Sequence, residues 1–157
     1  MSEQGISLGL GQGQTRRFTD LVLDYTGTLS LDGVLLPGVA EHLTALAGSI
    51  RVTVLTADTF GKAKGQLAGL PVDVRIVETG QDKAEFVKKL EPEHVIAIGN
   101  GRNDIAMMAL AGLRIAVIGR EGAWAELLLV ADVVVRDVLD ALDLATNPLR
   151  LKATLRD

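Results

Sequence analysis

The sequence predicts an α/β fold in which helices cover both faces of a mostly parallel β-sheet. Short β-branched segments alternate with stretches of helical length along most of the chain, and this alternation is typical of parallel strands joined by crossover helices. The strand segments are apolar almost throughout, as expected for strands that are buried on both faces. Glycine follows several helical stretches, where a left-handed cap ends a helix.

Six segments have the composition of buried strands, and six other stretches have helical length. The predicted strands are 21–24, 51–56, 72–77, 94–98, 114–118 and 132–135. The predicted helices are 38–48, 59–69, 81–90, 102–112, 121–130 and 136–145. No linker divides the chain, so we expect a single domain over residues 1–157. Within it, 1–17 are expected to contain an edge hairpin, and 147–157 form a basic tail.

The composition excludes several functional classes. The 157 residues carry a net charge of −4 and include no cysteine and two histidines, so any bound metal is expected to have oxygen ligands. No apolar segment reaches the roughly 18 residues of a membrane helix, and the N-terminus does not resemble a secretory signal. The acidic balance and 3% aromatic content are unlike a nucleic-acid-binding surface. We expect a cytoplasmic protein that binds neither membranes nor nucleic acid.

Polar residues follow four consecutive predicted strands. They are Asp24 to Thr28, Thr56 to Asp58, Lys83 one turn into the next helix, and Asn100 to Asp104. Taken singly, each has a structural explanation as a turn, a helix cap or a solvated lysine. Because the carboxyl ends of parallel strands form the ligand-binding edge of such a sheet, their ordered recurrence predicts one functional site there.

These residue types fit phosphoryl transfer through a carboxylate nucleophile. An ionised Asp24 is a suitable nucleophile for phosphorus, and Lys83 would neutralise charge and keep that carboxylate ionised. The Thr56 hydroxyl and the backbone N–H groups around Gly27 are candidate phosphate donors. Magnesium, which prefers oxygen ligands, is expected at the same edge. Its expected ligands are the Asp24 carboxylate, a backbone carbonyl near Thr26, and the loop containing Asn100 and Asp104.

The four motifs resemble those of the haloacid dehalogenase (HAD) superfamily. DYTGTL (24–29), VLTAD (54–58), Lys83 and GNGRND (99–104) are similar to its first to fourth motifs and occur in the family's order. The resemblance spans residues 18–146 and implies a three-layer Rossmann-like core. It also implies a magnesium-dependent phosphatase that acts on a phosphorylated substrate.

Carried over residue by residue, the resemblance assigns roles to the motif side chains. It makes Asp24 the nucleophile, Thr56 the phosphate-orienting hydroxyl and Lys83 the charge-neutralising amine, while Asp104 supports the metal loop. The implied substrate-binding residues are Gly27, Thr56, Ala57 and Lys83. Residues 29–36 would form the family's β-flap hairpin. Neither usual insertion point has room for a cap domain, so the chain resembles the capless branch, in which homo-oligomers are common.

Two departures from the family pattern bear on activity. Thr26 replaces the second Asp of the first motif, which is the family's general acid and base, and loss of such a group costs about 10²–10⁴ in rate. Asn100 replaces a metal-binding Asp and brings no charge. The pattern Asp-x-Thr-Gly-Thr is similar to that of P-type ATPases and of the small soluble proteins named for that likeness. We therefore expect a slow phosphohydrolase, or alternatively a phosphate-binding or regulatory module with negligible turnover.

Overall fold

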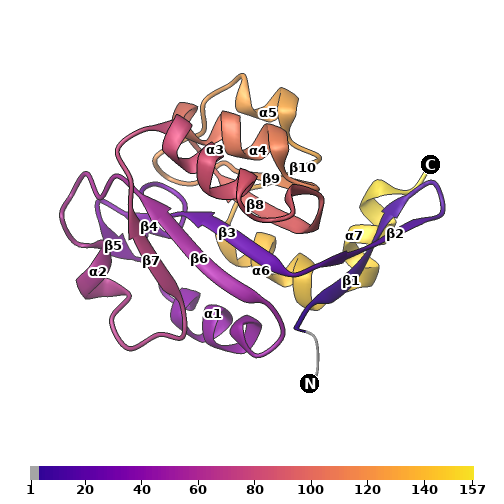
Figure 1. The fold of residues 1–157 in the computed structure, drawn as a ribbon, viewed down its shortest axis with the longest axis horizontal. Coiled ribbons are helices and arrows are strands. Elements are labelled where there is room, and N and C mark those ends of the chain that lie inside the picture. Colours follow the sequence, from indigo (N-terminus) through magenta and orange to yellow (C-terminus); the bar gives the residue numbers. More distant parts are fainter. Residues whose placement is uncertain (1–3) are drawn as a thin grey trace.

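A six-stranded parallel sheet forms the centre of the protein, as a computed structural model that describes residues 4–157 shows (Figure 1). Its strand order is β10-β9-β8-β3-β6-β7. The strands are β3 (Asp20–Asp24), β6 (Arg51–Thr56), β7 (Asp73–Ile76), β8 (Val95–Gly99), β9 (Leu113–Val117) and β10 (Val133–Val135). All six predicted strands are present, which confirms the predicted α/β class.

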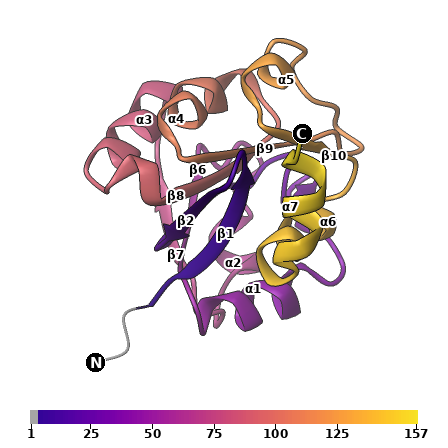
Figure 2. The ribbon, with the colours of Figure 1, turned by 90° about the vertical axis from the view of Figure 1, so that its right-hand side faces the viewer.

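Helices cover both faces of this sheet (Figures 1 and 2). They are α1 (Val39–Ala47), α2 (Ala63–Gln66), α3 (Gly80–Lys88), α4 (Ile105–Leu110), α5 (Leu127–Val130), α6 (Val138–Thr146) and α7 (Pro148–Leu155). Helices α3, α4 and α5 lie on one face, and α1 and α6 lie on the other. Two short 3₁₀ turns, Pro92–His94 and Arg102–Asp104, precede β8 and α4. Within residues 4–157, no helix has the length and apolar character needed to cross a bilayer.

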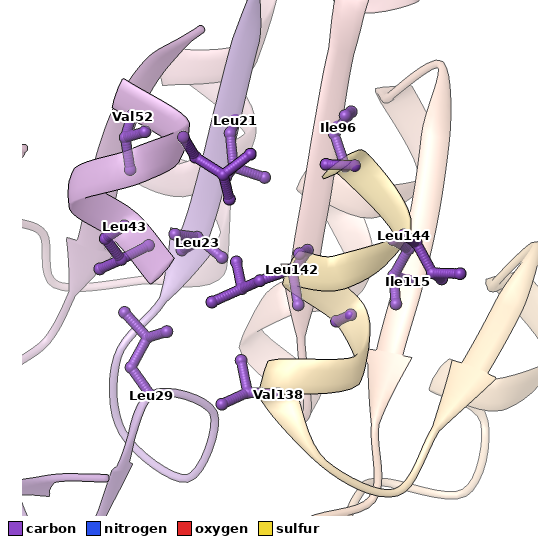
Figure 3. Packing of buried hydrophobic residues seen from close by; sticks show 14 of the residues in the cluster. Leu21, Leu23, Leu29, Leu43, Val52, Ile96, Ile115, Val138, Leu142 and Leu144 are labelled. Carbon is purple, nitrogen blue, oxygen red and sulfur yellow. The ribbon is translucent and has the colours of Figure 1, made fainter. Parts of the chain in front are cut away.

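The core consists of two apolar layers, one on each face of the sheet. The layer under α1 and α6 includes Leu23 of β3, Leu43 of α1 and Leu142 of α6, each at most 1% exposed (Figure 3). The other layer packs Val22 of β3 against Met107 and other residues of α3, α4 and α5. Successive residues of β3 thus enter opposite layers, because side chains alternate across a strand. Burial on both faces explains why this strand is apolar between Asp20 and Asp24.

Two predicted helices are much shorter than their sequence pattern indicated. The stretch 59–69 is helical only at Ala63–Gln66, because Gly61 adopts a φ of 67° and the Asp58 side chain caps a turn that begins later. The stretch 121–130 is helical only at Leu127–Val130, and Gly122 in the preceding loop has a φ of 80°. Positive φ at glycine ends helical geometry, so both segments begin as loops at the carboxyl edge of the sheet.

Two hairpins lie outside the main sheet. Strands β4 (Ser30–Leu31) and β5 (Val34–Leu35) pair antiparallel around Asp32 and Gly33, whose φ angles of 52° and 83° suit a tight two-residue turn. This is the hairpin expected after the first strand. Strands β1 (Ile6–Gly11) and β2 (Gln14–Phe18) form a separate two-stranded sheet and do not extend the main sheet.

The N-terminal hairpin packs against the C-terminal helix at one end of the molecule (Figures 1 and 2). The segment expected as a basic tail is helix α7, whose Leu151 is fully buried with Leu8 of β1 in the main core. Pro148 begins this helix at a position where its missing N–H costs nothing. The tail prediction missed this helix because its apolar partner lies at the opposite end of the sequence.

The strand order reverses at β3, and this reversal determines where the candidate site lies. From β3 the chain adds β6 and β7 on one side, and then β8, β9 and β10 on the other side. The ends of β3, β6 and β8 are therefore neighbours, and a parallel sheet binds ligands at the carboxyl edge near such a switch point.

Candidate active site

The predicted motif residues meet at the carboxyl edge of three adjacent strands. Asp24 is the last residue of β3, Thr56 is the last residue of β6, and Asn100 directly follows β8. Strand β3 pairs with both β6 and β8 in parallel register, so the three ends lie side by side. The structure thus brings together residues that are separated by up to 76 positions in the sequence.

A buried charge cluster lies at the base of this edge. Lys83 Nζ donates to Asp24 Oδ1 at 2.7 Å and to Asp104 Oδ1 at 2.8 Å. The three residues are 1%, 4% and 0% exposed, respectively. When both carboxylates are ionised, one ammonium group between them leaves one net negative charge in the cluster. A buried ion pair requires this close geometry to offset the cost of removing the charges from water.

Helix α3 positions the Lys83 side chain next to Asp24. Its N-cap, Thr79, accepts a hydrogen bond from the Asp82 N–H at 3.1 Å, and the Asp82 carboxylate accepts one from the Thr79 N–H at 3.0 Å. This reciprocal capping box fixes the first turn of the helix. Lys83 is the next residue, and it lies on the buried face together with Ala84 and Val87. The cap therefore determines where the ammonium group enters the site.

The loop after β3 needs glycine at position 27. Gly27 has a φ of 77°, and a Cβ atom there would collide with the side-chain amide of Asn100. The Thr28 hydroxyl lies 3.0 Å from Asp24 Oδ2 and 3.2 Å from Asn100 Oδ1, and its single proton can serve either oxygen. The close approach of these two loops brings the first and fourth motifs into contact.

A cavity of about 210 Å³ opens above the charge cluster. It is lined by Asp24, Thr26, Thr56, Ala57, Thr59, Asn100, Gly101, Asn103 and Glu121. Five predicted site residues are in this lining, whereas Gly27 lines a neighbouring cavity of about 90 Å³. Lys83 and Asp104 do not line it and act from beneath Asp24. Sequence reasoning missed Thr59 and Glu121 as site residues. Glu121 follows the fifth predicted strand, so extending the strand-end rule by one strand would have found it.

Thr56 has a hydroxyl proton available for a ligand. Its oxygen accepts a hydrogen bond from the Asp58 N–H at 2.8 Å, which occupies its acceptor side. Asp58 in turn accepts from the N–H groups of Lys62 and Ala63, each at 2.9 Å. The structure therefore fits both explanations: the Asp58 carboxylate caps the following turn, while the Thr56 hydroxyl proton stays available for a ligand.

The oxygen atoms around the cavity suit a hard cation. Asp24, Thr26 and Asn100 share one lining, and magnesium prefers carboxylate, carbonyl and amide oxygens such as these residues carry. Asp104 directs its oxygens elsewhere: Oδ1 to Lys83, and Oδ2 to the N–H groups of Asn100 and Gly101. It thus supports the loop, and its direct contact with a metal stays a prediction. Residues 4–157 contain no group of three or more His, Cys, Asp and Glu side chains arranged to bind a metal.

Burial dominates the ionisation of this cluster. Burial raises the pKa of the Asp24 carboxyl, Asp104 raises it further, and Lys83 lowers it, with the result at about 7. For Lys83, burial lowers the pKa, but the two carboxylates and their hydrogen bonds outweigh it and leave the pKa above its usual value. Lys83 is therefore charged at neutral pH. With a pKa of about 7, Asp24 is only partly ionised there, so Lys83 does not keep this carboxyl fully ionised as the sequence predicted.

We expect the Asp24→Asn variant to be more stable than the parent protein at pH 8 in the absence of metal. The folded protein binds the Asp24 proton more tightly than the unfolded chain does, since the pKa rises from 3.8 to about 7 on folding. This carboxyl therefore favours folding at low pH, and that contribution is lost as the pH rises through about 7. The gain in free energy of unfolding should shrink between pH 8 and pH 5.5, as measured by urea denaturation.

Asp20→Asn is the matched control for this measurement. Asp20 lies at the other end of β3, is also 4% exposed, and is paired with Arg51 at 2.8 Å. Its substitution should lower stability at both pH values because it breaks that pair. A stability difference for Asp24→Asn that is the same at pH 5.5 and pH 8 would contradict the expectation.

Known proteins share both the sequence pattern and the fold of this chain. A family model for haloacid dehalogenase-like hydrolases matches residues 69–139. An uncharacterized protein from Methanocaldococcus jannaschii is 54% identical over 74 residues, which are 46% of this chain and 80% of that protein.

Two solved structures of 3-deoxy-D-manno-octulosonate 8-phosphate phosphatases have the same fold. The Moraxella catarrhalis enzyme, solved with magnesium, phosphate and KDO, has a TM-score of 0.69 at 18% identity and covers 88% of this chain and 89% of its own. The Yersinia pestis enzyme has a TM-score of 0.65 at 23% identity over 88% and 84% of the two chains. The fold, the ordered motifs and the family model agree, and the chain belongs to the haloacid dehalogenase-like hydrolases.

Proposed function

We propose that this protein is a magnesium-dependent phosphohydrolase that forms an aspartyl phosphate on Asp24. The observation that carries the proposal is the Asp24 carboxylate at the wall of a polar cavity, held from beneath by the Lys83 ammonium at 2.7 Å. A nucleophile fixed in this way needs little reorganisation before it attacks. Family membership and the phosphatase fold neighbours support the same chemistry.

Each residue of the site has a role in this reaction. Asp24 attacks phosphorus, and the ester oxygen leaves. Lys83 balances the negative charge that gathers around Asp24, and Thr56 donates its free hydroxyl proton to a phosphoryl oxygen. Ala57 lines the same cavity, and its backbone N–H would donate to a second oxygen. Water then attacks phosphorus, which releases phosphate and restores the Asp24 carboxylate.

Magnesium would be held by Asp24, the Thr26 carbonyl and Asn100. When bound, it supplies positive charge that offsets the charge of the phosphoryl group. Asp24 is the single charged member of this ligand set, so we expect weaker binding than in a site with two or three carboxylates. When Asp24 is ionised, the net negative charge of the Asp24, Lys83 and Asp104 cluster favours a cation at the same place.

Slow turnover follows from the side chain at position 26. Thr26 lines the cavity but has no carboxyl group to protonate a leaving oxygen or to deprotonate water. Phosphoenzyme formation from a good leaving group needs little help of this kind. Hydrolysis of the phosphoenzyme does need a group that deprotonates water, so this second half of the reaction should limit the rate.

A second candidate is a phosphate-binding module with negligible turnover. The observation in its favour is that Thr26 and Asn100 stand where the family has acidic residues. Such a module would use the same cavity. Thr56 would donate to a phosphorylated ligand that is not hydrolysed, and Lys83 would supply positive charge from beneath Asp24.

The Thr26→Asp variant separates the two candidates. If the protein is an enzyme limited by its missing acid, this substitution should raise phosphate release from an aryl phosphate by about 10²-fold in the presence of magnesium. The parent should form an acid-stable phosphoenzyme or be trapped by a fluoride analogue of the phosphoryl group. No acceleration together with no phosphoenzyme in the parent would favour the binding module.

The remaining features expected from the sequence stay predictions. These are a phosphorylated substrate, a capless single domain, a cytoplasmic location and a homo-oligomeric state. A screen of phosphorylated metabolites with magnesium, combined with light scattering to measure the molar mass, would test the first and the last.

A further inference from the structure

The active-site cavity contains a second carboxylate that none of the four motifs supplies. Glu121 comes from the loop between β9 and α5 and lines the cavity together with Asp24 and Thr26. It is the second acidic residue among those that line the cavity. Asp24 is almost completely buried, whereas Glu121 is exposed and lies toward the solvent side. The two carboxylates therefore differ in position and in access to water.

Asn100 holds the loop that carries Glu121. The Asn100 side-chain Nδ2 donates to the Gly122 carbonyl at 3.0 Å, and the Trp124 N–H donates to the Asn100 carbonyl at 2.8 Å. An aspartate side chain at position 100 has no N–H group to donate to the Gly122 carbonyl. One of its carboxylate oxygens would therefore lie against the carbonyl oxygen. The amide at this position thus has a structural reason: it ties the Glu121 loop to the motif loop beside Asp24.

The β4–β5 hairpin holds the Glu121 side chain from the other side. The Asp32 N–H donates to Glu121 Oε2 at 3.2 Å, which joins the hairpin turn to a loop 89 residues away in the sequence. No ion pair engages Glu121 within residues 4–157. One carboxylate oxygen is therefore fixed by the hairpin, while the other remains for a ligand or a water molecule in the cavity.

We propose that Glu121 is the proton-transfer residue of this site and performs, from the loop after β9, the task that Thr26 cannot perform. The inference rests on the proposed phosphohydrolase function. In the first step, Asp24 bonds to phosphorus, the ester P–O bond breaks, and the leaving oxygen takes the proton of the Glu121 carboxylic acid. In the second step, water bonds to phosphorus and gives its proton to the Glu121 carboxylate, while the bond between phosphorus and Asp24 breaks. Phosphate is released, and both side chains return to their starting states.

Two features of the site limit the efficiency of Glu121. It is exposed to water, and its position depends on two loops that come from different parts of the fold. Proton transfer depends on a close and stable approach to the reacting oxygen. A carboxylate introduced at position 26 would stand beside Asp24 on the same loop, so it should replace Glu121 rather than add to it.

Glu121→Gln tests this assignment, because glutamine keeps an oxygen that can accept the Asp32 N–H but cannot exchange a proton. We expect steady-state phosphate release from an aryl phosphate to fall by about 10²-fold. The acid-quenched phosphoenzyme should still form and should accumulate above the parent level, since its hydrolysis is the impaired step. Glu126→Gln, an exposed acid that does not line the cavity, is the control and should match the parent.

The same substitution in the Thr26→Asp protein distinguishes proton transfer from a structural role. If Glu121 transfers the proton, its loss should change the rate of the Thr26→Asp protein less than about threefold, because position 26 now supplies a carboxylate. An equal loss in both backgrounds, or no loss in the parent background, would overturn the assignment. If neither the parent nor the Glu121→Gln variant forms a phosphoenzyme, the proposed function fails and this inference fails with it.

Discussion

Replacement of Asp24 by asparagine is expected to abolish phosphate release and phosphoenzyme formation. The asparagine amide nitrogen and oxygen fill the same space, but the side chain no longer has the anionic oxygen that attacks phosphorus. Loss of a nucleophile removes about 10⁴-fold or more of the rate. The measurement is magnesium-dependent phosphate release from an aryl phosphate, with the phosphoenzyme detected after an acid quench.

Asp20→Asn controls for the loss of a buried carboxylate as such. Both aspartates lie in β3 and are 4% exposed, but Asp20 is at the amino end and contacts Arg51 and Thr19 instead of the cavity. We expect the Asp20 variant to keep its activity per folded molecule while losing stability. Equal activity in the Asp24 variant and the parent would contradict the assignment of Asp24 as the nucleophile.

Replacement of Lys83 by methionine should affect both stability and activity. Methionine fills a similar volume but leaves Asp24 and Asp104 buried without the ammonium group that contacts both at 2.7 and 2.8 Å. Removal of one partner from a buried ion pair costs about 3–5 kcal/mol. In molecules that remain folded, loss of the positive charge should slow phosphoryl transfer by about 10²–10³-fold. Urea denaturation and phosphate release measure the two effects.

Lys88→Met is the matched control on the same helix. Lys88 is about half exposed and contacts Glu85 at 3.1 Å on the surface, and such pairs contribute about 0–1 kcal/mol. The double variant Asp24→Asn/Lys83→Met tests the cause, because removing one buried carboxylate should recover at least about 1 kcal/mol of the loss. If the double variant is as unstable as Lys83→Met alone, repulsion between the carboxylates is not the reason.

The strands could be predicted from the sequence because the signal that forms them is local. A run such as 51–56 consists mostly of β-branched residues, and β6 has these same bounds. Most helices follow from the same alternation. The helices predicted at 59–69 and 121–130 are too long, because the glycines and capping residues in these stretches form loops instead of helical turns. The sequence does not show that those loops border a cavity.

The site could be predicted in part for the same reason. Asp24, Thr56 and Asn100 follow strand ends, so the rule that ligands bind at the carboxyl edge brings them together before any coordinates are known. Glu121 follows the fifth predicted strand, beyond the strand ends that carry the motifs, and its place beside Asp24 depends on contacts with Asn100 and with the β4–β5 hairpin. Those contacts join segments that are far apart in the chain, and no short sequence pattern predicts such contacts.

The amino-acid sequence by itself determined the parallel sheet, its strands and the order of the four motifs, since these follow from side-chain chemistry and spacing along the chain. Only the tertiary structure decided which carboxylates face the cavity and which lie beneath it. It directed Asp104 toward Lys83 and two backbone N–H groups, and it brought Glu121 to the mouth of the cavity. The physical reason is that the environment of a charged group depends on which distant segments bury it or supply its hydrogen-bond partners.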